Sequence, residues 1–387
     1  MIWVKRFSGH FASRSQHRHG VFNHAGSSTK LCLQTMQDAL FPDEDPPAPA
    51  ARAGPSPRPA KADGQPAASR VCPQPPEPDH FELAGALPQG VRLGTSSWSY
   101  PGWKGLVWDT DYSDEQLSRY GLAAYAQNPL FRAVCLDRVF YRPLSALQYA
   151  AYANQVGEDF RFIVKAPALV ADATVRGETG RSIQPNPAFL NPELAVQEFV
   201  QPALQGLGPK LGALVFEISP LPRHLLASMS ELLQRLATML QAFPSLKEQA
   251  PDAVVAMEVR DPQWLTPDFA AVLKAAGATY CMGLHAKMPS VENQLPMLRA
   301  LWPGPLVCRW NLHRRHGAYG YEDAVKLYMP YNRLVDEDPE TRATLARVIN
   351  ATVKAGHPAY VTLGNKAEGC APMSVLALAR EIRAQLA

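Results

Sequence analysis

The sequence predicts an α/β fold of the (β/α)8, or TIM-type, barrel class, preceded by a disordered N-terminal tail rich in proline and alanine. After Gly90, eight short apolar runs alternate with segments of helical spacing, whereas the first 89 residues have a different composition. Alternating strands and helices imply a parallel sheet with crossover helices. A count of eight favours a closed barrel, with residues 1–89 as the tail and 90–387 as the barrel domain.

The eight runs are rich in β-branched residues and end at turn residues, as buried strands do. They start at Val91, Phe131, Phe160, Leu211, Ala253, Ala278, Pro305 and Ala359. An open doubly wound sheet is the alternative, because the stretch 168–193 is long and rich in Pro and Asn. No GxGxxG motif follows the first run, which argues against a dinucleotide-binding sheet.

Helical spacing recurs between these runs. Ser113 and Gln116 form a capping pattern at one start, and Thr266 followed by Pro267 marks another. Leu and Met residues recur three and four apart in a third segment. The expected helical segments are 113–127, 225–243, 266–277, 338–356 and 374–387, with a weaker one within 285–304.

The tail has two parts. Residues 38–79 consist largely of Pro and Ala, with too few large apolar side chains to offset chain entropy, so we expect disorder there. The first 35 residues carry five Lys or Arg, four His and no acidic residue. We interpret them as an extension upstream of a true start at Met36, with a transit peptide or a basic tail as alternatives.

The composition is that of a soluble globular protein, with 47% hydrophobic and 19% charged residues. A formal net charge of +3 does not favour a dedicated nucleic-acid binder, although nucleic acid stays among the partners considered. The six cysteines show no CxxC spacing, which indicates free thiols in a reducing compartment, and we expect a cytoplasmic location. No apolar run is long enough to span a membrane.

Chemistry in such barrels lies at the carboxyl ends of the strands. Polar and aromatic residues gather there in this sequence, and ionisable side chains within apolar runs are costly unless paired or used. The catalytic candidates are Glu258, Glu217 and Lys165. The candidates for substrate binding are Trp98, Tyr100, Asp137, Phe140, Tyr141, Arg260, Arg309 and Asn365.

A structural role is the alternative for both groups. The three cations and three carboxylates among these candidates would then pair as a buried electrostatic plug. The aromatic residues, which follow the first and second strands, would form a hydrophobic lid instead of the walls of a pocket. Trp103 and Trp108 are expected to pack in the core in either case.

Six ordered motifs resemble the YecE-like family, also called domain of unknown function 72. They are GTSSWSYPGWKG, FYRP, FRFIVKAP, LGALVFEISP, MEVRDPQWL and GNKAEGCAP, and the resemblance covers about residues 91–387. It implies a TIM-type barrel without a settled activity. The family's Gly-Thr-Ser-x-Trp-x-Tyr start, its Phe-Tyr pair, its strand-three lysine and its Glu-x-Arg pair with a following Trp are matched at Gly94, Thr95, Ser96, Trp98, Tyr100, Phe140, Tyr141, Lys165, Glu258, Arg260 and Trp264.

The sequence departs from the family pattern in the stretch 311–334 after strand seven and at three single positions. Cys135 stands where strand two usually has Glu, Glu217 stands where strand four usually has Gln, and Gly364 replaces the first residue of a paired Asn-Asn. A carboxylate lost from one strand and gained on another either preserves the charge of the pocket or marks a subgroup with altered activity.

The leading functional hypothesis is an enzyme, of the hydrolase or isomerase kind, that acts by acid/base chemistry on a small or oligomeric anionic substrate. Glu258 would be the general acid or base, tuned by Arg260 and Lys165, and the cations would hold a carboxylate or phosphate. The two Glu residues also invite a glycosidase interpretation, which needs a defined distance between the carboxyl groups.

A metal-dependent variant adds His285 and His313 to the two Glu residues, so the cofactor is unknown and a divalent metal is one alternative. A second hypothesis is a barrel that binds a ligand or nucleotide without turnover. A third is a scaffold whose Pro-rich tail docks partners, with a linker as the favoured role of that tail. The oligomeric state stays open.

Overall fold

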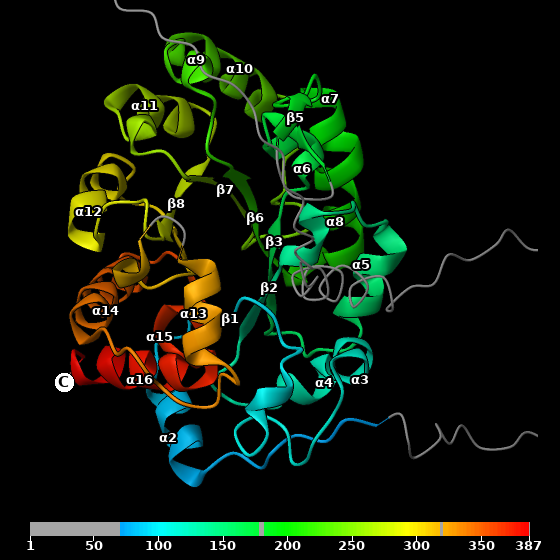
Figure 1. Ribbon diagram of the computed structural model, residues 1–387, viewed down its shortest axis with the longest axis vertical. Helices are drawn as coiled ribbons and strands as arrows, with labels where there is room; N and C mark the ends of the chain where they lie inside the picture. The colour runs from blue at the N-terminus through cyan, green and yellow to red at the C-terminus, as the bar shows by residue number, and fades with distance from the viewer. Residues whose placement is uncertain (1–69, 178–181, 318–319, 387) are drawn as a thin grey trace, which may run out of the picture.

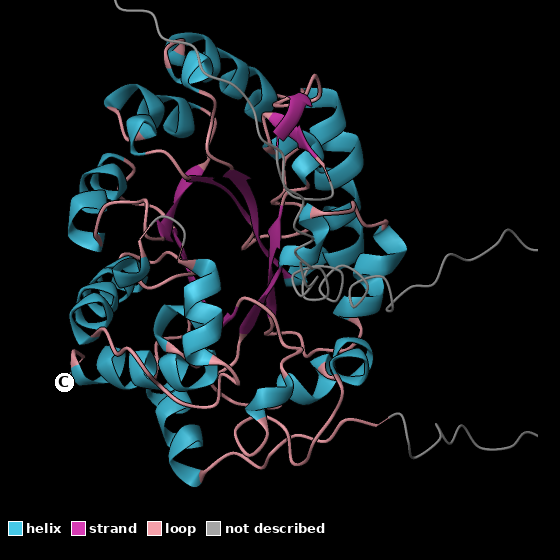
Figure 2. Ribbon diagram, viewed as in Figure 1, coloured by secondary structure: helices cyan, strands magenta, loops and turns pink. Residues whose placement is uncertain are grey.

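The computed structural model describes residues 70–177, 182–317 and 320–386 (Figure 1). Eight parallel strands close into one barrel in the order β1-β10-β9-β8-β7-β6-β3-β2, and helices surround it (Figure 2). The strands are β1 (Val91–Thr95), β2 (Ala133–Leu136), β3 (Arg161–Lys165), β6 (Leu211–Ile218), β7 (Val254–Val259), β8 (Thr279–Leu284), β9 (Leu306–Trp310) and β10 (Ala359–Leu363). The predicted (β/α)8 barrel is confirmed, because β1 pairs with both β2 and β10 and no open edge remains among these strands.

The helices that cover the strands differ widely in length. The longer ones are α2 (Pro78–Ala86), α3 (Asp114–Tyr120), α5 (Ala146–Ala153), α8 (Gln201–Leu207), α10 (Met229–Gln241), α11 (Pro267–Ala275), α12 (Val291–Ala300), α13 (Tyr321–Tyr328), α14 (Pro339–Lys354) and α16 (Ala371–Ala384). Single-turn helices are α4 (Leu122–Tyr125), α6 (Ala168–Ala171), α7 (Pro192–Ala195), α9 (Arg223–Leu226) and α15 (Asn365–Glu368), with irregular turns η3 (Pro101–Trp103), η4 (Asp137–Phe140), η5 (Val196–Val200), η6 (Gly208–Lys210), η7 (Pro262–Trp264) and η8 (Arg314–His316).

The expected helix signals are present in the structure. The Ser113 side chain accepts from the Gln116 backbone N–H and the reciprocal bond is made, so the predicted capping box at α3 is confirmed. Thr266 caps α11 in the same way through the Phe269 N–H. The weak segment after β8 forms α12 despite a proline at position 296.

Several elements were not predicted from the sequence, among them α13. Helix α5, which starts with a capping box at Ser145, and the run α7–η5–α8 complete the layer beside β3 and β6. The Pro- and Asn-rich stretch after β3 contains a two-stranded antiparallel hairpin, β4 (Thr174–Arg176) with β5 (Ser182–Pro185). These segments are short or interrupted by proline, so their periodicity is weak.

Packed structure begins before the predicted domain boundary. Helix α2 lies within the predicted tail, yet Leu83 is buried and Asp79 pairs with Arg380 of α16 at 3.0 Å. Pro73 forms a bridge with Trp108. Residues 78–86 are therefore helical, and the expectation of disorder does not hold for them. Residues 1–69, for which disorder was also expected, lie outside the described residues.

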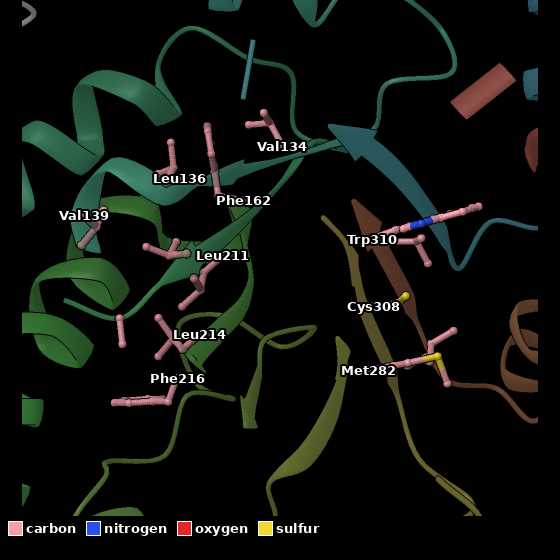
Figure 3. Packing of buried hydrophobic residues seen from close by; sticks show 14 of the residues in the cluster. Val134, Leu136, Val139, Phe162, Leu211, Leu214, Phe216, Met282, Cys308 and Trp310 are labelled. Carbon is pink, nitrogen blue, oxygen red and sulfur yellow. The ribbon is translucent and has the colours of Figure 1, made fainter. Parts of the chain in front are cut away.

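Strand residues alternate between two cores, as period-two geometry requires. One set faces the helices and belongs to the large outer cluster, which includes Leu136, Phe162 and Phe216 (Figure 3). The other set fills the barrel with small side chains, among them Ala133, Ala213 and Ala256.

Charged residues close the barrel at its amino end. Arg92 pairs with Asp159 at 2.6 Å, and Arg161 pairs with Asp252 at 2.7 Å, while the Tyr360 hydroxyl donates to the Asp252 carbonyl. The interior is thus polar at this end and apolar in the middle. A second polar layer lies at the carboxyl end, where barrels of this type carry their chemistry.

Candidate functional site

Two glutamates stand side by side at the carboxyl end of the barrel. Glu217 of β6 and Glu258 of β7 occupy partner positions in the parallel register. Glu258 is fully buried and Glu217 is 9% exposed. Two like charges in this position would repel each other at low dielectric, so cations must compensate them.

Arg260 and Arg309 supply this compensation. Arg309 Nη1 lies 2.8 Å from Glu217 Oε2 and 2.5 Å from Glu258 Oε2. Arg260 Nη2 lies 2.8 Å from Glu217 Oε2 and 2.8 Å from Glu258 Oε1. Each guanidinium therefore bridges both carboxylates, and each is itself buried.

Asp137 and Lys165 extend the network toward the mouth. Arg309 Nη2 contacts Asp137 Oδ1 at 2.6 Å, and Lys165 Nζ lies 3.3 Å from Glu217 Oε1 and 3.7 Å from the centre of the Phe140 ring. Three carboxylates thus face three cations, which we call the charged plug: Asp137, Glu217, Glu258, Lys165, Arg260 and Arg309. The plug is neutral as a unit.

Glu217 and Arg309 hold their charges firmly. Burial by itself would raise the pKa of Glu217, but Arg260, Lys165 and Arg309 hold that pKa well below its usual range. Burial would lower the pKa of the Arg309 guanidinium, and the carboxylates of Asp137 and Glu258 raise it instead. These groups are therefore suited to fixed electrostatics and less to carrying protons at neutral pH.

His285, after β8, is a neutral group beside the plug. Burial, followed by the charge of Arg260, lowers its pKa to about 4. Its Nδ1 accepts the Lys287 backbone N–H at 3.2 Å, which leaves the proton of the neutral ring on Nε2. Its ring lies 5.3 Å from that of Tyr321.

Tyr321, the first residue of α13, links His285 to the last strand. The ring is partly exposed, but protein surrounds its hydroxyl end, and this burial raises the pKa of Tyr321 to about 12. Lys366 Nζ lies 5.8 Å from the centre of the Tyr321 ring and 5.7 Å from that of Tyr331. Cation–π contact at this range is weak but attractive.

Lys366 differs from the plug cations because no carboxylate of the described residues lies within ion-pair distance of it. It follows β10 directly, is partly buried, and forms no ion pair with any residue that the structure describes. Burial lowers its pKa. A cation kept in such a position without a counter-charge is a candidate contact for an anionic ligand.

The loop that carries Tyr331 is held tightly over the first strand-to-helix connection. Tyr331 has a φ of 67°, a left-handed conformation that is strained for an aromatic residue. Its ring meets Tyr100 edge-on at 5.8 Å. A Cβ at Gly102 would lie 1.6 Å from the Pro330 carbonyl oxygen, so only glycine permits this approach.

The remaining aromatic candidates have separate positions. Tyr141 is 69% exposed and stands edge-on to Phe140. Trp98 instead packs among the helices, where its indole N–H donates to the Leu117 carbonyl and its ring meets Tyr152. Trp98 is therefore not brought to the mouth.

Asn365 serves the fold more than the mouth. Its Oδ1 accepts the Trp103 indole N–H at 3.1 Å and the Ala371 backbone N–H at 2.9 Å, so it ties η3 to the start of α16. Trp103 and Trp108 are fully buried, as expected for core residues.

The residues proposed for a metal do not form a ligand set. The glutamate oxygens face arginines, and His313 lies beside Asp338, with 3.9 Å between Nε2 and Oδ2. Among the residues described, no group of three or more His, Cys, Asp or Glu side chains is arranged to hold a metal ion. The donor set therefore gives the metal-dependent variant no support.

Sequence reasoning missed Tyr321 and Tyr331 as residues of the mouth. Both come from the stretch 311–334 after β9, which departs from the family pattern and holds two further tyrosines, at 319 and 328. The available signal was the density of aromatic residues after a strand end. Only the path of the chain over the barrel shows which of them reach the mouth.

Fold and site define a (β/α)8 barrel protein with an ion-paired cluster at the carboxyl ends of its strands. The chain belongs to the family described as protein of unknown function DUF72, whose family model matches residues 92–387. This confirms the resemblance noted from the motifs. No curated protein matches the chain.

Solved structures of the family are similar to this chain at low identity. A DUF72 family protein from Enterococcus faecalis V583 is 16% identical, with 76% of this chain and 95% of that chain covered and a TM-score of 0.48. One from Thermotoga maritima MSB8 is 17% identical, with 76% and 98% covered and a TM-score of 0.45.

Proposed function

We propose that this protein is an enzyme that binds a small anionic substrate at the carboxyl-end mouth of its barrel and acts on it by acid/base chemistry. The observation that carries the proposal is the unpaired Lys366 beside a neutral plug. Lys366 adds one positive charge to the six plug residues, whose formal charges cancel. An anion is the ligand that complements this excess.

The plug has a positioning role in this proposal. Glu258 and Glu217 were the first candidates for proton transfer, but their contacts with Arg260 and Arg309 favour a fixed framework that holds the floor of the mouth. Arg309 Nη1 contacts both carboxylates, at 2.8 and 2.5 Å, and so occupies the position that a glycosidic bond would need between them, which does not favour the glycosidase interpretation.

His285 and Tyr321 are the groups that we assign to proton transfer. A neutral imidazole with its proton on Nε2 donates a hydrogen bond without carrying charge, and a phenol next to it extends the reach of that donor. Hydrolysis and isomerisation are both compatible with this pair of groups. Four of the five described cysteines are buried and all five are free, which supports the proposed cytoplasmic location.

Titration calorimetry with inorganic phosphate and small carboxylates tests the anion site. Replacing Lys366 by Met is expected to weaken binding at least about tenfold, since a hydrogen bond to a charged group contributes about 1.5–3 kcal/mol. Lys274→Met removes the same charge from the exposed last turn of α11 and is the matched control. Equal affinities in the wild type and both variants would contradict the proposal.

A barrel that binds without turnover is the alternative function. His285→Asn separates the two, because a catalyst keeps its affinity for the anion and loses turnover, whereas a binding protein changes only in affinity. The measurement is turnover of a panel of phosphate esters and small hydroxy acids.

A further inference from the structure

Two lysines at the mouth have opposite environments. Lys165 is paired with Glu217 at 3.3 Å and lies over Phe140, so its charge is compensated. Lys366 has only the rings of Tyr321 and Tyr331 at 5.8 and 5.7 Å, and the structure describes no carboxylate within ion-pair distance of it. Of the two, Lys366 is the one whose surroundings disfavour the charged form, and burial lowers its pKa.

We propose that Lys366 is a nucleophile that forms an imine with an aldehyde or ketone group of the anionic substrate. This inference rests on the proposed function and names the substrate class of the same site. An amine in a desolvated position beside aromatic rings is the usual form of a Schiff-base lysine, because only the neutral amine attacks a carbonyl carbon.

The reaction balances without an oxidant or a reductant. The ammonium of Lys366 first releases one proton to solvent. The neutral amine then attacks the carbonyl carbon, a C–N bond forms, the π bond of the carbonyl breaks, and the first amine hydrogen moves to the oxygen, which becomes the hydroxyl of a carbinolamine. This hydroxyl then leaves as water, which carries away the second amine hydrogen, and a C=N bond remains. The Tyr321 ring lies 5.8 Å from Lys366 Nζ and 5.3 Å from the His285 ring, so Tyr321 is the proton-carrying side chain next to the attacking nitrogen and His285 lies behind it.

The backbone of Lys366 and the loop beside its side chain are both fixed by the fold. The His313 N–H donates to the Lys366 carbonyl at 2.8 Å, and the strained Tyr331 supports one side of the lysine from a loop clamped over Gly102. Strained residues persist where the surrounding structure over-determines them, and they cluster at functional sites. A nucleophile needs this kind of fixed approach to its carbonyl.

The test uses pyridoxal 5′-phosphate, which carries both an aldehyde and a phosphate, followed by reduction with borohydride and peptide mass mapping of the full chain. We expect one stable adduct on Lys366 of the wild type before the exposed Lys104 is labelled. Lys366→Arg is expected to lose this adduct completely, whereas Lys274→Arg keeps it. Pyridoxal, which lacks the phosphate, is expected to label Lys366 more slowly.

The outcomes separate this inference from the proposed function. Calorimetry with phosphate on Lys366→Arg is expected to show retained binding, because the charge is kept. Phosphate binding without an adduct on Lys366 would overturn the imine and leave the anion site standing. An adduct on Lys366 without phosphate binding would overturn the anion site alone. Equal labelling of Lys366 and Lys104 in the wild type would contradict the proposal that Lys366 is a nucleophile, independently of the results for the variants.

Discussion

Single residues at the mouth divide by whether their charge is compensated. Glu217 and Glu258 are buried and fully paired, so they hold arginines in position. His285 is buried as a neutral group, and Lys366 is a cation without a partner among the described residues. Burial excludes water from all four, but only the last two keep a proton that a substrate can exchange.

The low pKa of His285 predicts a pH-dependent stability. The folded protein keeps this imidazole neutral down to about pH 4, whereas the unfolded chain protonates it near its ordinary value of 6.5. The unfolded state therefore binds more protons in this window, and the contribution of His285 to stability falls as the pH falls, by about 3 kcal/mol in total.

Urea unfolding of the wild type and His285→Asn checks this expectation. The difference in unfolding free energy between the two proteins is expected to shrink by about 3 kcal/mol from neutral pH to about pH 4. His224→Asn, at an exposed position of α9, is the matched control. A difference that stays constant over this range would contradict the buried neutral state of His285.

At the scale of elements, helices cover the barrel in a layer that extends beyond the predicted domain. Helix α2 packs against α16 through Leu83, and the isolated bridge at Pro73 joins the chain to Trp108. Apolar content in residues 70–89 is low, yet Val71, Leu83 and Leu87 are buried. A composition argument over the whole tail hides such a short packed segment.

The packing of α2 predicts different effects for two substitutions on one helix. Leu83→Ala is expected to lower the unfolding free energy by about 2–5 kcal/mol, because the side chain is 3% exposed. Phe81→Ala, at a position that is 56% exposed, is expected to change it by less than about 0.5 kcal/mol. Denaturant unfolding measures both, and equal losses would mean that α2 does not pack as described.

At the scale of the whole molecule, the two ends of the barrel have different tasks. The amino end carries Arg92 and Arg161 paired to aspartates that are half exposed, whereas the carboxyl end carries the plug and the unpaired Lys366. Within the described residues no helix combines the length and the apolarity needed to cross a membrane. Because the two ends carry different charged groups, substitutions at the amino end should change stability, and substitutions at the carboxyl end should change ligand binding.

Substitutions at the two ends test this division. Arg161→Met is expected to lower the unfolding free energy by about 2 kcal/mol through loss of its bond to Asp252, with phosphate affinity unchanged. Lys366→Met is expected to weaken phosphate binding and to leave the unfolding free energy unchanged. Calorimetry and denaturant unfolding on both variants give the comparison, and a loss of phosphate affinity in Arg161→Met would argue against it.

The sequence predicts the barrel, because eight β-branched apolar runs alternate with segments of helical spacing and both signals are local. It also placed the six residues of the plug at the strand ends. Only the tertiary structure decided that these residues neutralise one another, that Trp98 packs among helices, and that Tyr321 and Tyr331 flank Lys366. Pairing and exposure depend on which loops cross the mouth, and the path of a loop is set by packing over long sequence distances.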